Sequence, residues 1–167
     1  MQQLWAPWRM ELIAGEKPKG CIFCLLPAEQ GEAADRKNLI VARTAHSFVI
    51  LNRFPYNNGH LMVVPRHHTS DPAELSGEEY ADLNALLLRT LGVLRELYRP
   101  EGFNLGMNLG QVAGAGIADH VHYHVVPRWN GDTNFMPVLA QTKVMNEHLE
   151  RSQERLAAAF DRAPGSR

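Results

Sequence analysis

Several short runs of the chain are rich in hydrophobic residues and bounded by polar or turn residues, and this pattern predicts β-strands. The runs 38–44, 46–52 and 60–65 are rich in Val, Ile, Leu and Phe, which suit a pleated, half-buried surface. A Pro-Tyr-Asn-Asn-Gly sequence between the last two runs indicates a turn. Residues 102–110 fit a fourth strand, and 119–129, "DHVHYHVVPRW", a fifth.

Two further stretches repeat apolar residues with a helical period. In the stretch 76–98, Ser76 and Glu79 have the spacing of a capping box at a helix start. Apolar residues then recur every three or four positions, at Tyr80, Leu83, Leu87, Leu91 and Leu94. The stretch 142–162 predicts a final, mostly polar helix. Successive strands with two separate main helices favour an α+β domain with a sheet of about five mainly antiparallel strands.

Length, composition and charge narrow the class of protein. At 167 residues, the natural expectation is one domain spanning 1–167, with a short flexible tail at 163–167. Apolar residues make up 45% and charged residues 21%, as in ordinary soluble globular proteins. The net charge of −1 provides no overall attraction to nucleic acid or an anionic membrane. No apolar run approaches the ~20 residues of a membrane-spanning helix, so we expect neither nucleic acid nor membrane as partner.

The N-terminal segment, 1–36, carries both cysteines of the chain, Cys21 and Cys24, as a Cys-x-x-Cys pair. Its first twenty residues lack the continuous apolar stretch of a secretory signal, so we expect a cytoplasmic protein. A reducing compartment argues against a structural disulfide and leaves metal binding or redox chemistry for the pair. The absence of a thioredoxin-like βαβ pattern around the cysteines favours metal binding.

Three of the eight histidines, His120, His122 and His124, stand at every second position of the run 119–129. Successive side chains of a strand point to opposite faces, so these three imidazoles share one face. Neighbouring histidines would lie about 6.6 Å apart along a straight strand, and the outer two about 13 Å apart. One metal ion can therefore bind two neighbours but not all three. At least one histidine must act otherwise, for example as a nucleophile at phosphorus.

The loop before the histidines, 110–116, reads "GQVAGAG" and contains three glycines in seven residues. Such a loop lets the backbone approach a ligand closely and present N–H groups to an anion. Phosphoryl and nucleotidyl transfer depend mainly on positioning and on donors for negatively charged oxygens. The loop and the histidines together favour that chemistry.

The run 120–126, His-Val-His-Tyr-His-Val-Val, is similar to the signature of the histidine triad (HIT) superfamily of nucleotide hydrolases and transferases. The stretches 20–24, "GCIFC", and 51–68, "LNRFPYNNGHLMVVPRHH", resemble further landmarks of that family in their usual order. The stretches 4–13 and 131–144 most resemble its bacterial branch of diadenosine tetraphosphate phosphorylases. The resemblance implies a HIT-like fold and commonly a homodimer.

The resemblance also implies roles for individual residues. His122, the middle histidine, would be the nucleophile that attacks the α-phosphorus and holds a nucleoside monophosphate. His124 would contact the phosphate oxygens and help bring charge or a proton to the leaving group. Asn52 would bind the ribose, although on local sequence alone it reads as a turn residue at a strand end. Asn108 would face the scissile phosphates.

Zinc-containing relatives imply a metal site as well. The ligands carried over by resemblance are Cys21, Cys24, His68 and His120, with His67 as a neighbouring rival to His68. Four protein ligands close a tetrahedral Zn²⁺ site, so the metal would be structural. His120 would then serve the metal while the other two histidines of the row serve chemistry.

The chain departs from the family pattern in one place. Related hydrolases carry a Gln shortly before the triad, whereas the stretch 113–117 reads "AGAGI", with Ala115 or Gly116 at that position and Gln111 earlier. We expect Gly114 and Gly116 to contribute to substrate binding and to leave room for an acceptor larger than water. Inorganic phosphate as acceptor would give phosphorolysis of diadenosine tetraphosphate to ADP and ATP through a nucleotidyl-histidine intermediate.

Other functions stay open at this point. Within the same superfamily, the chain could be a dinucleoside polyphosphate hydrolase or a nucleoside phosphoramidate hydrolase, although the long segment after Trp129 fits the latter poorly. A different class is a metal-dependent enzyme or binding protein that uses His120 and His122 as ligands. A third class is a non-catalytic interaction module held together by zinc.

Overall fold

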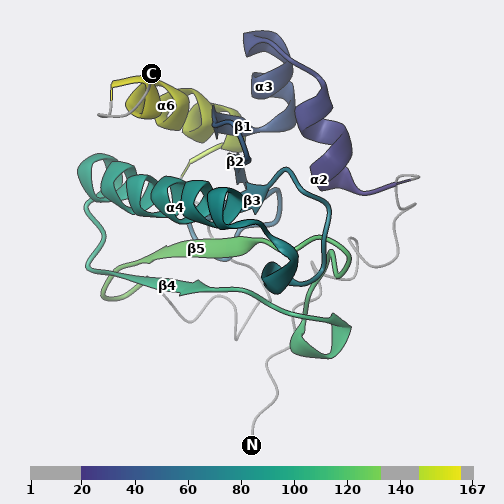
Figure 1. Cartoon of the computed structure of the whole chain (residues 1–167). Helices are drawn as coiled ribbons and strands as arrows, with labels where there is room; N and C mark the ends of the chain where they lie inside the picture. The colour runs from purple at the N-terminus through teal and green to yellow at the C-terminus, as the bar shows by residue number, and fades with distance from the viewer. Residues whose placement is uncertain (1–19, 133–146, 163–167) are drawn as a thin grey trace, which may run out of the picture.

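A computed structural model describes residues 20–132 and 147–162, which fold around a five-stranded sheet (Figure 1). The strands are β1 (Ile40–Arg43), β2 (Ser47–Leu51), β3 (Leu61–Pro65), β4 (Gly102–Gly106) and β5 (Tyr123–Arg128). They lie in the order β1-β2-β3-β5-β4, and every neighbouring pair is antiparallel. The α+β class and the antiparallel five-stranded sheet are thereby confirmed.

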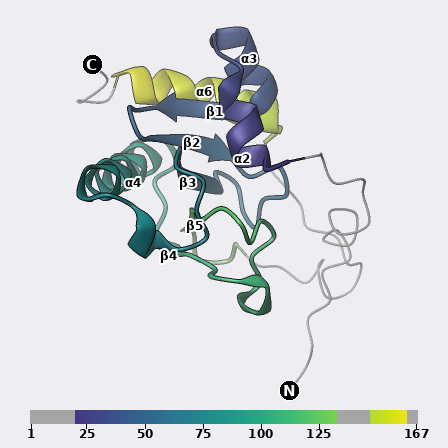
Figure 2. The same cartoon turned by 45° about the vertical axis from the view of Figure 1, so that its right-hand side comes forward.

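Two long helices and several short ones surround the sheet. They are α2 (Ile22–Leu25), η1 (Leu26–Ala28), α3 (Glu32–Asn38), η2 (Pro72–Glu74), α4 (Gly77–Tyr98), η3 (Gln111–Ala113) and α6 (Leu149–Arg162). Helix α4 covers one face of the sheet, while α6 and α3 lie beside β1 (Figures 1 and 2). Strands β2 and β3 are buried throughout and form the centre of the core together with one face of α4.

Helix α4 starts as its sequence predicts. The Ser76 hydroxyl accepts a hydrogen bond from the Glu79 backbone N–H (3.2 Å), and the Glu79 carboxylate accepts one from the Ser76 N–H (2.8 Å). The residues of its buried face are Leu83, Leu86, Leu87, Thr90, Val93 and Leu94. Tyr80, which the periodicity placed with the core leucines, is 47% exposed, so the buried face begins one turn later.

The strand predicted over 119–129 begins only at Tyr123. Before it, the Val121 N–H donates to the carbonyl of Thr69 (2.7 Å), a loop residue, so the chain has left the β4–β5 pairing there. Strand β4 correspondingly ends at Gly106, four residues earlier than predicted. The first two histidines of the row therefore lie before the sheet, His120 at a bend and His122 in irregular chain.

The sequence did not predict α3, and the strand expected from residue 38 starts at Ile40 instead. This helix is short and polar, and it ends where Leu39 adopts a left-handed φ of 61°. Tertiary contacts stabilise it, for example the hydrogen bond that the Asn38 amide donates to the carbonyl of Leu26 (3.2 Å). A helix stabilised by such contacts has no periodic pattern of hydrophobic residues that could be recognised in the sequence.

The last helix begins at Leu149, because residues 147 and 148 are not helical. The remainder of the predicted helix, 142–146, lies outside the described residues, as does the expected tail at 163–167. The single domain spanning 1–167 stays a prediction. Within the described ranges, no helix has both the length and the apolar character needed to cross a bilayer.

Glu147 joins the start of α6 to the end of α4. Its carboxylate accepts hydrogen bonds from the Tyr98 hydroxyl (3.1 Å) and the Ser152 hydroxyl (2.8 Å) and pairs with Arg155 (2.5 Å). Burial alone would raise the pKa of Glu147, but these donors outweigh it and hold the pKa below its ordinary value of 4.5. The charged carboxylate is therefore the form that stabilises this junction.

We expect Glu147→Gln to lower the free energy of unfolding by about 1–2 kcal/mol near neutral pH, because charge-assisted hydrogen bonds are lost. Since the folded pKa is depressed, this stabilisation is present above pH 4.5 and disappears as pH falls through the folded pKa. Urea denaturation near pH 7 and about pH 3 checks this. Glu96→Gln, an exposed change on α4, is the control, and an equal Glu147→Gln effect at both pH values would contradict the prediction.

Candidate active site and metal centre

His122 and His124 form the centre of the candidate site, with ring centroids 4.8 Å apart. His122 is 4% exposed, and its Nδ1 lies 2.9 Å from the backbone carbonyl oxygen of His120. A carbonyl only accepts hydrogen bonds, so Nδ1 carries the proton and Nε2 keeps a lone pair. Burial lowers the pKa of His122 below its ordinary value of 6.5 and keeps the ring neutral. His122 thus has the tautomer that a nucleophile needs.

His124 carries its proton on the other ring nitrogen, Nε2, because of a buried neighbour, His60. The Tyr56 backbone N–H donates to Nδ1 of His60 (3.0 Å), so His60 carries its proton on Nε2. That Nε2 lies 3.0 Å from Nδ1 of His124 and donates to it. His124 consequently holds its own proton on Nε2. A hydrogen-bond donor therefore lies beside the lone pair of His122.

His60 is a functional candidate that the sequence does not reveal, because there it stands only as the first residue of an apolar strand. The side chain is fully buried, and its role depends on the pairing of β3 with β5, which sets Met62 opposite His124. The only local signal was a histidine directly after an Asn-Gly turn and before a run of core residues.

Asn52 lies at the end of β2 and combines a turn role with a place beside the histidines. Its side-chain oxygen accepts a hydrogen bond from the Phe54 N–H (2.9 Å), as in an Asx turn. Its amide nitrogen lies 3.4 and 3.5 Å from the two ring nitrogens of His60. The turn interpretation is therefore correct for this residue, and ribose binding stays a prediction.

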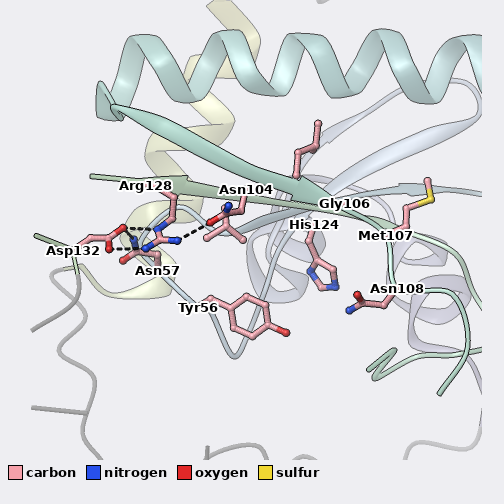
Figure 3. Close-up of a pocket in the computed structure, with 11 residues that line it drawn as sticks. Tyr56, Asn57, Asn104, Gly106, Met107, Asn108, His124, Arg128 and Asp132 are labelled. Atoms are coloured by element: carbon pink, nitrogen blue, oxygen red, sulfur yellow. Dashed lines mark hydrogen bonds and ion pairs between the residues drawn. The ribbon is translucent and has the colours of Figure 1, made fainter. Parts of the chain in front are cut away.

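A cavity of about 430 Å³ opens beside His124 (Figure 3). The residues that line it include Tyr56, Asn104, Asn108, His124, Val126 and Arg128. Asn108 thus lines the same cavity as His124, and its expected place facing the scissile phosphates stays a prediction. The two candidate glycines of the preceding loop, Gly114 and Gly116, are exposed and are not among the lining residues of this cavity.

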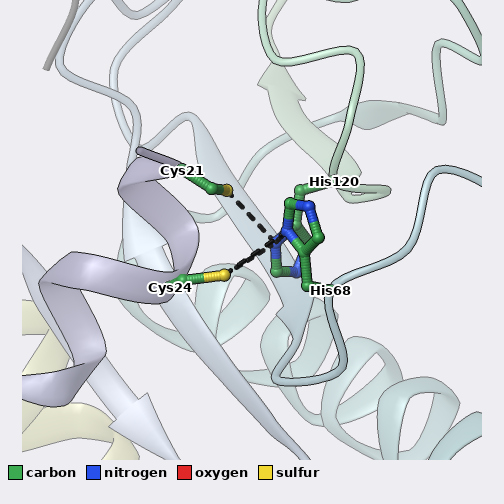
Figure 4. Close-up of side chains that lie close together, drawn as sticks. All are labelled: Cys21, Cys24, His68 and His120. Carbon is green, nitrogen blue, oxygen red and sulfur yellow. Dashed lines mark hydrogen bonds between the residues drawn. The ribbon is translucent and has the colours of Figure 1, made fainter. Parts of the chain in front are cut away.

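Four metal-ligating side chains converge at the other end of the histidine row (Figure 4). Nδ1 of His120 lies 3.3 Å from Sγ of Cys21, 3.7 Å from Sγ of Cys24 and 3.2 Å from Nδ1 of His68. A tetrahedral Zn²⁺ with S and N ligands at about 2.3 and 2.0 Å separates its ligand atoms by roughly 3.3–3.8 Å. His120 donates from Nε2 to the carbonyl of Pro65 (2.8 Å), which leaves Nδ1 as the ligand atom. The donor set fits zinc.

The structure distinguishes His68 from His67. His67 is turned away from the cluster and pairs with the carboxylate of Glu79 (3.2 Å) at the start of α4. Nδ1 of His68 lies 3.4 Å from Sγ of Cys24. His68 is therefore the histidine that joins the two cysteines, as the resemblance implied.

The cluster of Cys21, Cys24, His68 and His120 is in direct contact with His122. Phe23, between the two cysteines, is fully buried, with ring centroid distances of 5.5 Å to His120 and 4.9 Å to His122. His120 also supplies the carbonyl that fixes the His122 tautomer. The cluster thus holds α2 against the segment that carries His122.

Comparison with known proteins bears on this site. A model of the HIT domain family matches residues 33–131. The AP-4-A phosphorylase of Mycobacterium tuberculosis (strain H37Rv) is 38% identical over 169 aligned residues, which cover 98% of this chain and 87% of that protein. The adenosine 5'-monophosphoramidase hnt1 of Schizosaccharomyces pombe is 33% identical over 110 residues, which cover 66% of this chain and 75% of that protein.

Among solved structures, the crystal structure of a Zn-bound histidine triad family protein from Mycobacterium smegmatis matches with a TM-score of 0.64 and 27% identity. The match covers 84% of this chain and 93% of that one. The resemblance and the HIT-like fold expected from the sequence are confirmed, and the chain is an enzyme of the nucleotidyltransferase or hydrolase type. The chain belongs to the HIT family.

Proposed function

We propose that the chain catalyses phosphorolysis of diadenosine tetraphosphate to ADP and ATP. The observation that carries this proposal is the pair of opposed tautomers: His122 offers a lone pair at Nε2, and His124 beside it offers a proton at Nε2. A neutral nucleophile next to a hydrogen-bond donor for the leaving oxygen suits a double displacement at phosphorus. The similarity to the M. tuberculosis AP-4-A phosphorylase supports this choice of reaction.

In the first step, Nε2 of His122 attacks the α-phosphorus, and the bond from that phosphorus to the oxygen bridging it to the β-phosphorus breaks. ATP leaves as an anion with the electron pair on that oxygen, which accepts a hydrogen bond from the Nε2–H of His124. AMP remains covalently bound to His122. In the second step, an unprotonated oxygen of inorganic phosphate attacks the AMP phosphorus, and the Nε2–H of His124 again donates a hydrogen bond to the phosphate oxygens. The phosphorus–nitrogen bond breaks, His122 regains its lone pair, and ADP leaves.

The remaining candidate residues have supporting roles in this proposal. Asn52 binds the ribose of the AMP half, and Asn108 binds phosphate oxygens from the wall of the cavity beside His124. The loop with Gly114 and Gly116 presents backbone N–H groups to phosphate. Because this loop lacks the Gln of related hydrolases, it leaves space for the phosphate acceptor.

We also propose that Zn²⁺ binds to Cys21, Cys24, His68 and His120 as a structural ion. With four protein ligands there is no open position for substrate or water. The ligand distances support this, as does the Zn-bound neighbour from M. smegmatis. When bound, the ion would fix the four side chains and hold α2 beside the nucleophile. Two thiols kept reduced for this purpose favour a cytoplasmic enzyme.

A homodimer is part of the same proposal. Strand β4 is an edge of the sheet, and unpaired edges invite strand pairing. Large apolar side chains are exposed on β4 itself at Leu105 (48%) and on α4 at Tyr80 (47%) and Leu88 (68%). A two-fold contact between copies through β4 and α4 would cover this face.

Product analysis tests the proposed reaction directly. We expect ADP and ATP from diadenosine tetraphosphate only when inorganic phosphate is present. AMP and ATP irrespective of phosphate would instead indicate a hydrolase. Turnover of adenosine phosphoramidate without cleavage of diadenosine tetraphosphate would favour a phosphoramidase like hnt1.

The proposed effect of the missing Gln on the choice of acceptor is tested by introducing Gln at position 116. Gly116 does not adopt the positive φ seen at Gly114 (90°), so Gly116→Gln introduces no backbone strain. We expect this change to lower phosphate-dependent turnover by about tenfold and to release AMP through attack by water. Ala113→Gln in the same exposed loop is the matched control. Unchanged phosphorolysis in Gly116→Gln would show that the Gln position does not select the acceptor.

A further inference from the structure

The cavity beside His124 is a groove along the histidine face of the sheet. Side chains alternate along β5, so His124, Val126 and Arg128 point to one face. On β4, Gly106 pairs with His124 and Asn104 pairs with Val126, and both line the cavity. The groove therefore runs along β4 and β5 from His124 toward Arg128, at the opposite end of the histidine row from the metal cluster (Figure 3).

The far end of the groove is a fixed polar network. Arg128 donates to both carboxylate oxygens of Asp132 (2.6 and 2.9 Å) and to the side-chain oxygen of Asn104 (2.6 Å). The Asn57 amide donates to the same carboxylate (2.8 Å) and ties the β2–β3 loop to the end of β5. Because Asp132 balances the charge of Arg128, this end does not select a chain of phosphates. It suits an uncharged group with hydrogen-bonding edges.

The walls between the two ends are aromatic and apolar. The half-exposed ring of Tyr56 lies 6.0 Å from the His124 ring, and Val126 and Met107 line the groove as well. Asn108 adds an amide near His124. Flat apolar walls with a few amides are the usual surroundings of a heteroaromatic ligand. The cavity volume of about 430 Å³ lies within the range of small-molecule sites.

The donor at His124 shows which half of a substrate the groove would hold. His60 keeps the proton of His124 on Nε2, so the oxygen that accepts a hydrogen bond from this N–H must lie on the His124 side of the reacting phosphorus. That oxygen belongs to the leaving group. The groove begins at His124 and extends away from His122, so it lies where the leaving group continues.

We propose that this groove binds the nucleoside of the departing nucleotide, and that it makes the enzyme selective for substrates with a second nucleotide as leaving group. The inference rests on the proposed nucleotidyl transfer through His122. Contacts remote from the reacting phosphorus would raise kcat/KM only for substrates long enough to reach them. A substrate with a small leaving group would gain nothing from the groove.

The test uses a variant with a narrower groove and compares its kcat/KM for two substrates. Gly106→Val places a β-branched side chain on β4 opposite His124, where an added Cβ has no atom within 4 Å. Gly102→Val, on the same strand and face but outside the groove lining, is the matched control, and an added Cβ also has open space there. The substrates are diadenosine tetraphosphate with inorganic phosphate, and adenosine phosphoramidate, whose leaving group is ammonia.

We expect Gly106→Val to lower the ratio of kcat/KM for diadenosine tetraphosphate to that for adenosine phosphoramidate by at least about tenfold, the effect of losing a modest binding contact. Gly102→Val should leave the ratio unchanged. An equal loss for both substrates would indicate damage at His124 and would overturn the proposal, as would no loss for either.

A second measurement does not depend on turnover. A crystal structure with a methylene-bridged, non-cleavable analogue of diadenosine tetraphosphate should show its second adenosine between Tyr56 and Val126. A second adenosine that is disordered or bound elsewhere would overturn the groove assignment. If the wild-type enzyme fails to cleave diadenosine tetraphosphate, the proposed reaction is wrong, and this measurement still decides what the groove binds.

Discussion

Replacing His122 with alanine is expected to lower kcat/KM for diadenosine tetraphosphate at least about 10⁴-fold, the scale seen when a covalent nucleophile is removed. The lone pair at Nε2 of His122 exists because the His120 carbonyl holds the proton on Nδ1. The neighbouring His124 cannot replace it, since His60 donates to its Nδ1 and keeps its Nε2 protonated. Steady-state turnover with and without inorganic phosphate measures the loss.

His124→Ala is the informative comparison. It removes a donor but leaves the nucleophile, so we expect a smaller loss of about 10²–10⁴-fold. Circular dichroism of both variants checks that the fold is retained. If His122→Ala kept activity within tenfold of the wild type, the assignment of the nucleophile would be wrong.

Loss of the metal site is expected to have the largest effect on stability. Cys24→Ser, or removal of the ion by a chelator, should reduce bound zinc from one ion per chain to almost none. We expect the free energy of unfolding to fall by about 3–4 kcal/mol, the stabilisation from a ligand present at several hundred times its Kd, because α2 loses its attachment to the segments that carry His68 and His120. For a chain of this size, that corresponds to a decrease in Tm of roughly 10 °C.

Elemental analysis and thermal denaturation measure these changes. His67→Ala is the matched control, since His67 precedes the ligand His68 but pairs with Glu79 outside the cluster. It should keep full zinc content. Undiminished zinc in Cys24→Ser would remove the proposed site. Activity without the ion should fall but persist, because the ion has no open position and acts only through the contacts of Phe23 and His120 with His122.

Much of the fold was predictable because its elements carry their own hydrophobic pattern. The strands β2 and β3 and the helix α4 are long enough for their apolar period to be read, and Ser76 and Glu79 mark the helix start. Helix α3 was not predictable, since its seven residues are mostly polar and its stability comes from contacts such as that of Asn38 with Leu26. The early end of β4 also depends on tertiary hydrogen bonding.

The candidate site, like the fold, was predictable from the sequence only in part. The alternating spacing of the histidine row was readable in the sequence, and a resemblance supplied the four metal ligands that the structure brings together. The protonation pattern was not readable, because it depends on the His120 carbonyl and on His60, which reaches His124 only through the β3–β5 pairing. The expectation that Gly114 and Gly116 contribute to substrate binding remains a prediction, since both lie in an exposed loop.

A nucleotidyl group on His122 is the central feature of the proposed reaction, and its detection is the most direct test. The wild-type protein would be mixed with diadenosine tetraphosphate in the absence of inorganic phosphate, quenched, and examined by intact-mass and peptide-mapping spectrometry. We predict one AMP group per chain, attached to His122, which added phosphate releases as ADP. Product formation with no adduct, or an adduct on another residue, would contradict the proposed reaction.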